Sequence, residues 1–267
     1  MTASAHLLLS LRRLAERCSR RLHLTRRLPA RFGALRLRIS PGASLTYYRG
    51  LRQRSFHDLY DFAEGYVQPG QTVWDVGPNM GVFAFAAAAR AQIAGRVLCL
   101  EPDLWSVNLL LRSCRYNRGR AAPVDVLPVA VSDDLRLEWL NIPERCRAAT
   151  HLASSGGGAG EEITGAVREQ HLVPSVTLDW LADRYPLPQV IKIDVDGSEY
   201  RVLTGGRTLL RQHRPILLTE VYERNADTVS TLLHELGYAL FDYNNCEAGK
   251  RPISRAVYNT LALPLPR

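Results

Sequence analysis

The chain has 267 residues, 46% of them hydrophobic and 22% charged, which suffices for one full core but is short for two ordinary enzyme domains. The net charge of +8 is concentrated: residues 1–40 hold ten arginines against the single acid Glu16, a balance of +9 that leaves −1 for the remainder. Five widely spaced cysteines without a C-x-x-C pair argue against a disulfide framework or a structural zinc site, and no apolar run approaches the roughly 18–20 residues that span a bilayer.

The first segment has the pattern of a basic amphipathic helix, because apolar residues recur at spacings of three and four with arginines between them: Leu7, Leu8, Leu11, Leu14, Cys18 and Leu22. Such a helix packs on the domain or a second subunit, attaches to an anionic membrane surface, or serves as an organelle-targeting peptide, and the sequence leaves these three open. We divide the chain into a basic N-terminal arm over residues 1–44 and one domain over residues 45–267.

From about Thr72 short apolar runs alternate with helical stretches, which is typical of βαβ units and a mostly parallel sheet with helices on both faces. Strands are predicted near residues 72–76, 96–100, 124–131, 190–195, 215–221, 238–242 and 256–261. Helices are predicted over residues 80–91, 104–117, 199–212 and 227–236. Together they indicate an α/β, Rossmann-like fold built on a seven-stranded sheet.

Between Ser132 and Val173 the periodicity fails, and we predict irregular structure there. Residues 153–160, rich in glycine and serine, follow no strand and open no helix. They are typical of a plain loop or a mobile lid rather than of a phosphate cradle.

The stretch from Val73 to Phe83 has the features of a ligand-binding turn: a buried strand with Asp75 near its end, then a turn with Gly77 and Gly81 that enters a helix. Glu101 follows 26 residues after Asp75, at the end of the next strand, where a carboxylate accepts hydrogen bonds from both hydroxyls of a ribose. These features favour an adenosine-type site over an ordinary α/β turn. They differ from the G-x-G-x-x-G pattern of dinucleotide enzymes.

In order and approximate spacing the motifs of this chain resemble those of the FkbM family of methyltransferases. The resemblance covers roughly residues 65–222 and rests on PGQTVWDVGPNMG at 69–81, LEP at 100–102, SVTLD at 175–179, IKIDVDGSE at 191–199 and LTE at 218–220. Pro78 and Asp196 depart from it, since the family more often has alanine and glutamate there.

The resemblance implies a class I methyltransferase fold, S-adenosylmethionine as cofactor, and O-methylation of natural products or saccharides. It implies that Asp75, Gly77 and Asn79 lie along the methionine part of the cofactor and Glu101 on the ribose. We add Gly81, on the same turn, and Asp194 to the predicted cofactor-contacting residues.

Four acids are predicted to gather at the carboxyl ends of two neighbouring strands: Asp194, Asp196, Glu199 and Glu220. An alcohol must lose a proton to accept a methyl group, so one of them is a candidate general base, with Asp194 first, then Glu220, and His151 from the irregular segment. Two alternatives stay open: a divalent cation held by two or three of these acids, which we do not expect, and capping of the next helix by Asp196 and Glu199.

The sequence therefore predicts a methyltransferase that uses S-adenosylmethionine, without a metal, on a hydroxyl of a saccharide or small natural product. N-methylation, a non-catalytic cofactor-binding protein, and a nucleic-acid-binding protein using the arm are the alternatives. We do not expect nucleic acid as a partner, because the remainder of the chain has a balance of −1 and no basic stripe. We expect a cytoplasmic protein, leave peripheral membrane contact through residues 1–40 open, and predict no oligomeric state.

Overall fold

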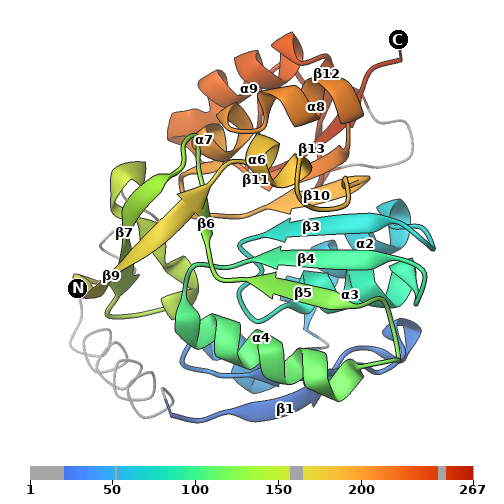
Figure 1. The fold of residues 1–267 in the computed structure, drawn as a ribbon, viewed down its shortest axis with the longest axis vertical. Coiled ribbons are helices and arrows are strands. Elements are labelled where there is room, and N and C mark those ends of the chain that lie inside the picture. Colours follow the sequence, from blue (N-terminus) through green and yellow to red (C-terminus); the bar gives the residue numbers. More distant parts are fainter. Residues whose placement is uncertain (1–20, 52, 157–164, 246–250, 267) are drawn as a thin grey trace.

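The computed structural model describes residues 21–51, 53–156, 165–245 and 251–266. Its centre is a seven-stranded sheet in the order β12-β13-β11-β10-β3-β4-β5 (Figure 1). The strands are β3 (Thr72–Val76), β4 (Arg96–Leu100), β5 (Val124–Leu127), β10 (Val190–Ile193), β11 (Ile216–Glu220), β12 (Tyr238–Asp242) and β13 (Asn259–Pro264). Only β13 runs antiparallel to its neighbours, so the predicted mostly parallel seven-stranded α/β fold is confirmed.

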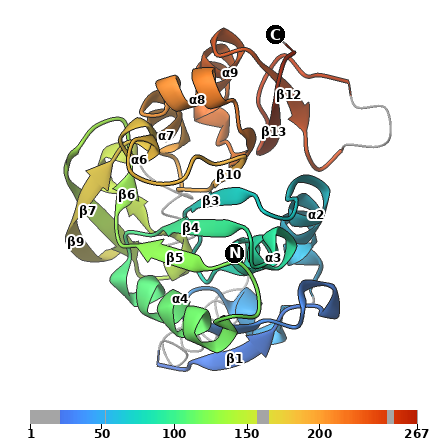
Figure 2. The ribbon, with the colours of Figure 1, turned by 45° about the vertical axis from the view of Figure 1, so that its right-hand side comes forward.

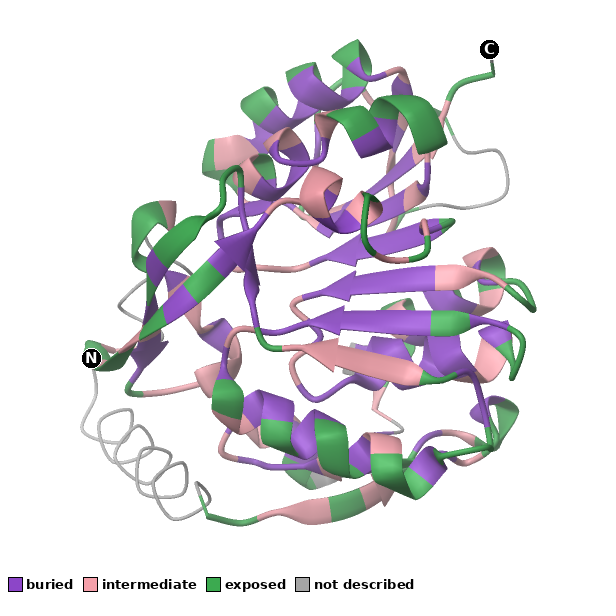
Figure 3. Ribbon diagram, viewed as in Figure 1, coloured by how far each residue is buried: buried purple, intermediate pink, exposed green. Residues whose placement is uncertain are grey.

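Helices cover both faces of this sheet because its central strands are apolar on both sides. One face packs against α2 (His57–Tyr66), α3 (Val82–Ala91) and α4 (Leu104–Asn117). The other packs against α6 (Leu178–Ala182), α7 (Glu199–Thr204), α8 (Arg207–His213) and α9 (Ala226–Glu235) (Figure 1). The buried residues form a continuous layer along the strands in Figure 3. No helix within the described ranges is long and apolar enough to cross a membrane.

The predicted helix over residues 199–212 is two helices, α7 and α8, separated by Gly205 and Gly206. A Cβ on Gly205 would lie 2.2 Å from the carbonyl oxygen of Ser132, so the chain can pass there only without a side chain. Helix α2 was not among the predicted elements.

Residues 24–39 form a β-hairpin that belongs to the domain core. Its strands β1 (Leu24–Arg27) and β2 (Arg36–Ile39) pair antiparallel. Asn117 of α4 bonds both backbone groups of Arg36, and Ser113 Oγ accepts from the amide of Arg38. Five apolar residues of this segment are at most 1% exposed: Leu28, Phe32, Leu35, Leu37 and Ile39. The hairpin is therefore part of the core, although it precedes the predicted domain boundary at residue 44. The predicted arm helix lies almost wholly in residues 1–20, outside the described residues.

The prediction of irregular structure between Ser132 and Val173 is wrong. A second sheet in the order β6-β9-β7-β8 forms there. It comprises β6 (Ala130–Val131), β7 (Arg136–Pro143), β8 (His151–Leu152) and β9 (Val167–Val176), and it stands beside the carboxyl ends of β3, β4 and β5 (Figures 1 and 2). The sequence of β7 lacks the usual hydrophobic alternation because the strand exposes Leu137 and Trp139 while it buries Glu138. Of the glycine-rich tract at 153–160, residues 157–160 lie outside the described residues.

The remaining short elements are 3₁₀ turns: Ala30–Phe32, Leu45–Arg49, Arg54–Phe56, Arg147–Ala149, Ala153–Ser155 and Glu223–Asn225. The turn at Arg147–Ala149 is tied to the N-terminal part of the chain, since the amide of Ala148 donates to the carbonyl of Ala43 at 3.0 Å. The second sheet is thus anchored beside the central one.

Candidate functional site

The turn after β3 lies where the strand order reverses, between β3 and β10, which is the usual position of a ligand in an open α/β sheet. Gly77 has a φ of +77°, and a Cβ there would lie 1.8 Å from the carbonyl oxygen of Asp194. Asn79, at φ 50°, continues the turn. Only a glycine permits this approach of the two strand ends, which places the backbone of Gly77 beside Asp194.

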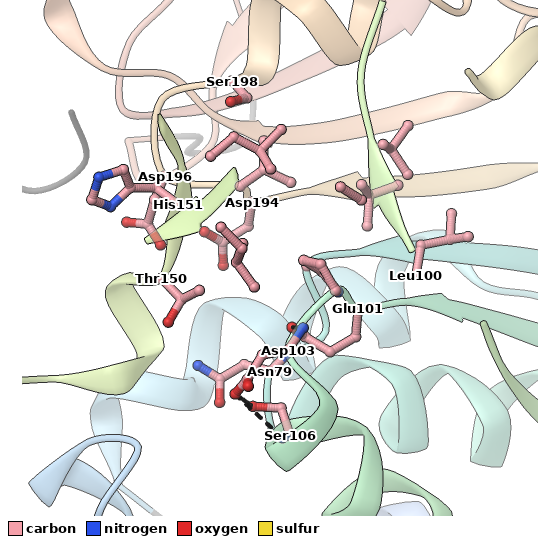
Figure 4. Close-up of a pocket in the computed structure, with 18 of the residues that line it drawn as sticks. Asn79, Leu100, Glu101, Asp103, Ser106, Thr150, His151, Asp194, Asp196 and Ser198 are labelled. Carbon is pink, nitrogen blue, oxygen red and sulfur yellow. Dashed lines mark hydrogen bonds between the residues drawn. The ribbon is translucent and has the colours of Figure 1, made fainter. Parts of the chain in front are cut away.

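Two cavities meet at this point. Cavity 1, of about 630 Å³ including its open mouth, is lined by residues of four regions (Figure 4). These are Val76, Gly77 and Asn79 at the end of β3; Leu100, Glu101, Pro102, Asp103 and Ser106 at the end of β4 and beyond it; Ala130, Val131, Leu140, Arg147, Ala148, Thr150, His151 and Leu152 from the second sheet and its connections; and Asp194, Val195, Asp196 and Ser198 after β10. Its floor is therefore the carboxyl edge of the central sheet, and its wall is the second sheet.

Glu101 is held at the floor of cavity 1. Its carboxylate accepts hydrogen bonds from the amides of Asn79 at 3.1 Å and Asp103 at 3.0 Å, and the residue is 7% exposed. Burial and the nearby charge of Asp103 raise the pKa of Glu101 to about 8. A hydroxyl pair that donates to this carboxylate would favour its ionised form.

Asp103 and Arg147 form a buried ion pair in the wall of cavity 1 that the sequence did not reveal. Arg147 Nε and Nη2 each lie 2.7 Å from a carboxylate oxygen of Asp103, and the guanidinium stands 5.0 Å from the ring centre of Trp105. Asp103 also caps α4 by accepting from the amides of Trp105 and Ser106. Although burial opposes it, the hydrogen bonds from Arg147 hold the pKa of Asp103 below its ordinary value. The pair joins the second sheet to α4 across the cavity.

Cavity 2 adjoins cavity 1 and is larger, at about 1340 Å³ including its open mouth. Gly77, Asn79, Ala148 and Asp194 line both cavities. The other residues of cavity 2 are Ser44, Thr46, Tyr47, Phe56, Asp58, Leu59, Pro78, Val82, Phe83, Lys192, Ile193, Leu218, Glu220, Tyr243, Tyr258 and Asn259. A group bound at Asp194 is accessible from both sides.

Lys192 organises the carboxylates at this junction. Its ammonium lies 3.0 Å from Asp194 Oδ2, 3.2 Å from the carbonyl oxygen of Gly77 and 3.6 Å from Asp75 Oδ1. Although burial opposes the charge, Asp194 and Asp75 raise the pKa of Lys192 above its ordinary value. The lysine thus fixes the Asp194 side chain, which is 31% exposed.

Asp75 lies behind the cavities rather than in their walls. It is fully buried, and neither carboxylate oxygen has a hydrogen-bond partner. Burial, opposed by Lys192, raises its pKa to about 6. Side chains alternate along a strand, so Asp75 faces opposite to Trp74 and Val76 and lies beneath Lys192. This position favours a role for Asp75 as a partner of Lys192 over direct contact with a ligand in either cavity.

The four predicted acids lie near one another, since the charges of Asp194, Glu220 and Glu199 all raise the pKa of Asp196, but they do not all face the same cavity. Asp194 lines both cavities, Asp196 lines cavity 1, Glu220 lines cavity 2, and Glu199 lines neither. Glu199 is fully buried and accepts from the amide of Gly197 at 2.8 Å, which is a structural contact. Within the described residues no group of three or more His, Cys, Asp and Glu side chains is placed to hold a metal ion.

Glu220 and Asp196 each accept a hydrogen bond from a tyrosine. Tyr258 donates to Glu220, and Tyr222 donates to Asp196 at 2.9 Å. Burial and the charge of Asp194 raise the pKa of Glu220 to about 7 and that of Asp196 well above its ordinary value.

His151 lies in cavity 1, with Nδ1 3.1 Å from the carbonyl oxygen of Ala149. Gly81 lines neither cavity. It starts α3 at φ +82°, and a Cβ there would lie 2.7 Å from Leu110 Cδ2, so its role is in packing. Of the predicted site residues, Gly77, Asn79, Glu101, Asp194 and His151 thus surround cavity 1, while Glu220 joins Asp194 in cavity 2.

A family model described as the methyltransferase FkbM domain matches residues 75–243, more than half of the chain. No curated protein matches.

Three solved structures illustrate the similarity in fold. A methyltransferase FkbM from Methylobacillus flagellatus KT is 15% identical with a TM-score of 0.48, over 78% of this chain and 53% of its own. A SAM-dependent O-methyltransferase from Thermotoga maritima is 14% identical with a TM-score of 0.46, over 79% and 66%. Aeropyrum pernix fibrillarin, solved with natively bound S-adenosyl-L-methionine, is 11% identical with a TM-score of 0.42, over 74% and 67%. The chain thus spans about half the length of the first of these.

Proposed function

The chain belongs to the FkbM family of S-adenosylmethionine-dependent methyltransferases, and from this premise we propose that it methylates a hydroxyl group on a saccharide or small natural product. Cavity 1 takes the cofactor and cavity 2 the acceptor. The observation that carries the proposal is the position of Asp194 in the walls of both cavities.

The residues of cavity 1 fit the cofactor. Asn79 lines both cavities, and its side-chain oxygen is buried without a hydrogen-bond partner, as expected of an acceptor that awaits a donor from a ligand. Glu101 is placed to accept hydrogen bonds from ribose hydroxyls, and Gly77 leaves its backbone bare at the junction. When bound, S-adenosylmethionine supplies a methyl group carried on a positively charged sulfur.

Asp194 is the proposed general base. Lys192 holds Oδ2, so the carboxylate keeps one orientation and its other oxygen is available to an acceptor hydroxyl in cavity 2. Removal of the hydroxyl proton by a positioned carboxylate contributes a factor of about 10²–10⁴ to a rate. Glu220 lines only cavity 2 and His151 only cavity 1, so neither stands between cofactor and acceptor as Asp194 does.

The test uses Asp194→Asn and methyl transfer from ¹³C-labelled S-adenosylmethionine into a small-molecule extract of the source organism. We expect label on oxygen with the wild-type protein, identified by the chemical shift of the methyl carbon, and a loss of about 10²-fold or more with the variant. Asp183→Asn is the matched control, since Asp183 is 82% exposed and lines neither cavity. Label on nitrogen, or full transfer by Asp194→Asn while it still binds S-adenosylhomocysteine, would contradict the proposal.

A further inference from the structure

Cavity 2 combines aromatic rings with a surplus of carboxylates. Its rings include Tyr47 and Phe56, stacked at 5.5 Å, together with Tyr243 and Tyr258. Its carboxylates are Asp58, Asp194 and Glu220, whereas Lys192 is the one lysine or arginine among its described wall residues. The wall is therefore net negative.

The charge of Lys192 is already used within the protein. Its ammonium contacts Asp194, Asp75 and the carbonyl of Gly77, and it is 4% exposed. Glu220, in contrast, makes no ion pair within the described residues, and its hydrogen bond comes from the neutral hydroxyl of Tyr258. The charge of Lys192 reaches Glu220 only from beyond ion-pair distance, so within the described residues cavity 2 contains a partly buried carboxylate with no cation in direct contact.

We propose, resting on the proposed function, that the acceptor carries a protonated amino group beside the hydroxyl that is methylated, and that Glu220 binds this ammonium. An amino sugar or an amine-bearing polyol has this chemistry. Carboxylates and aromatic rings both attract ammonium ions, and residues of both kinds line cavity 2. Phosphorylated or carboxylated acceptors would meet like charge there and are rejected.

Burial and the charge of Asp194 raise the pKa of Glu220 to about 7, which makes the recognition dependent on pH. Above this pH the carboxylate is ionised and pairs with the ammonium. Below it the carboxyl group is neutral, so the preference for a cation weakens.

The cofactor itself carries an amino group, so the test is made with S-adenosylhomocysteine bound. That ligand keeps the amino and carboxyl groups of the cofactor but lacks the charged sulfur. Any preference for a cation that remains in its presence belongs to the acceptor site.

Three polyols of the same carbon chain serve as probes: 1-amino-1-deoxysorbitol, which is cationic, sorbitol, which is neutral, and gluconate, which is anionic. Binding is measured by calorimetry at about pH 8, above the pKa of Glu220 and below that of an alkylamine, which is about 10. We expect the amine to bind at least about tenfold more tightly than sorbitol, which corresponds to about 1.4 kcal/mol, and gluconate to bind most weakly. Glu220→Gln should abolish the preference, while Glu223→Gln, whose side chain is 84% exposed and pairs with Arg255, should keep it.

Tyr258→Phe provides a second variant that keeps the carboxylate. Without the hydroxyl donor the pKa of Glu220 rises, so the preference for the amine should persist but shift to higher pH. Equal affinity for the amine and sorbitol, a preference for gluconate, or an unchanged preference in Glu220→Gln would each overturn the inference. If S-adenosylhomocysteine itself fails to bind, the proposed function fails instead, and the two failures are thereby distinguished.

Discussion

Lys192 and Glu101, near the junction of the two cavities, each hold or neutralise charged groups there. Lys192 is the counter-ion of two carboxylates, one buried and one facing both cavities. Glu101 stays at the floor of cavity 1 on two backbone amides. We predict an effect on stability for Lys192 and an effect on ligand binding for Glu101.

Lys192→Met should destabilise the fold strongly. It would leave Asp75, whose oxygens have no other partner, and Asp194 without a compensating charge, and breaking a buried pair in this way costs about 3–5 kcal/mol. The measurement is urea unfolding. Arg184→Met is the control, because its ion pair with Asp183 is exposed and worth about 1 kcal/mol at most; equal effects of the two variants would contradict the role given to Lys192.

We predict that Glu101 makes cofactor binding dependent on pH. Its pKa of about 8 means that at neutral pH the carboxyl group is mostly protonated, whereas hydroxyl donors of a ribose bind the ionised form better. Binding therefore lowers this pKa and releases a proton, so affinity for S-adenosylhomocysteine should increase as pH rises toward about 8 and then level off. Calorimetry across this range on the wild type and on Glu101→Gln checks it, and an unchanged pH profile in the variant would count against the ribose contact.

At the scale of elements, the second sheet forms the wall of cavity 1, and ion pairs fix it to the central domain at two places. Arg201 of α7 pairs with Glu138 of β7 at 3.1 Å, and Arg147 pairs with Asp103 beside cavity 1. Arg147 comes from the 3₁₀ turn between β7 and β8, and Asp103 from the start of α4. The same turn carries Ala148, which lines both cavities.

Arg147→Met should leave the fold intact but loosen this wall. We expect S-adenosylhomocysteine to dissociate about tenfold faster, with a small change in association rate, since a lost contact acts mainly on dissociation. Stopped-flow kinetics gives both rates. Arg168→Met removes an arginine paired with the adjacent Glu169 on β9 and should change neither rate. Equal dissociation rates in the two variants would show that the Arg147–Asp103 pair does not hold the wall of cavity 1 in place.

The elements that the sequence predicted and those it missed differ in physical kind. The strands β3, β4, β10 and β11 are apolar runs between amphipathic helices, so periodicity locates them, and with them the strand-end residues Gly77, Glu101 and Asp194. Strand β7 has apolar residues on both of its faces, which cancels the alternation. The pair Asp103–Arg147 joins residues 44 positions apart through that sheet, so no local pattern indicates it.

At the scale of the whole molecule, the hairpin of residues 24–39 packs into the core although it precedes the predicted boundary at residue 44. Residues 24–39 supply five fully buried apolar side chains, each worth about 1.5–3 kcal/mol, against a total stability of about 5–15 kcal/mol. Removing residues 1–20 removes none of them.

Deletion of residues 1–20 should therefore preserve the thermal transition and S-adenosylhomocysteine binding, whereas deletion of residues 1–40 should abolish cooperative unfolding. Differential scanning calorimetry distinguishes the two. A cooperative transition in the shorter protein at the wild-type temperature would mean that the hairpin is dispensable and that the boundary at residue 44 holds.

The central claim is that cavity 1 binds S-adenosylmethionine, and calorimetric titration with S-adenosylhomocysteine tests it most directly. We predict micromolar affinity, about −8 kcal/mol, clear weakening by Glu101→Ala, and no binding of NAD. Binding of NAD in place of S-adenosylhomocysteine, or no binding of either, would contradict the assignment of the cofactor to cavity 1. It would then also contradict the assignment of the acceptor to cavity 2.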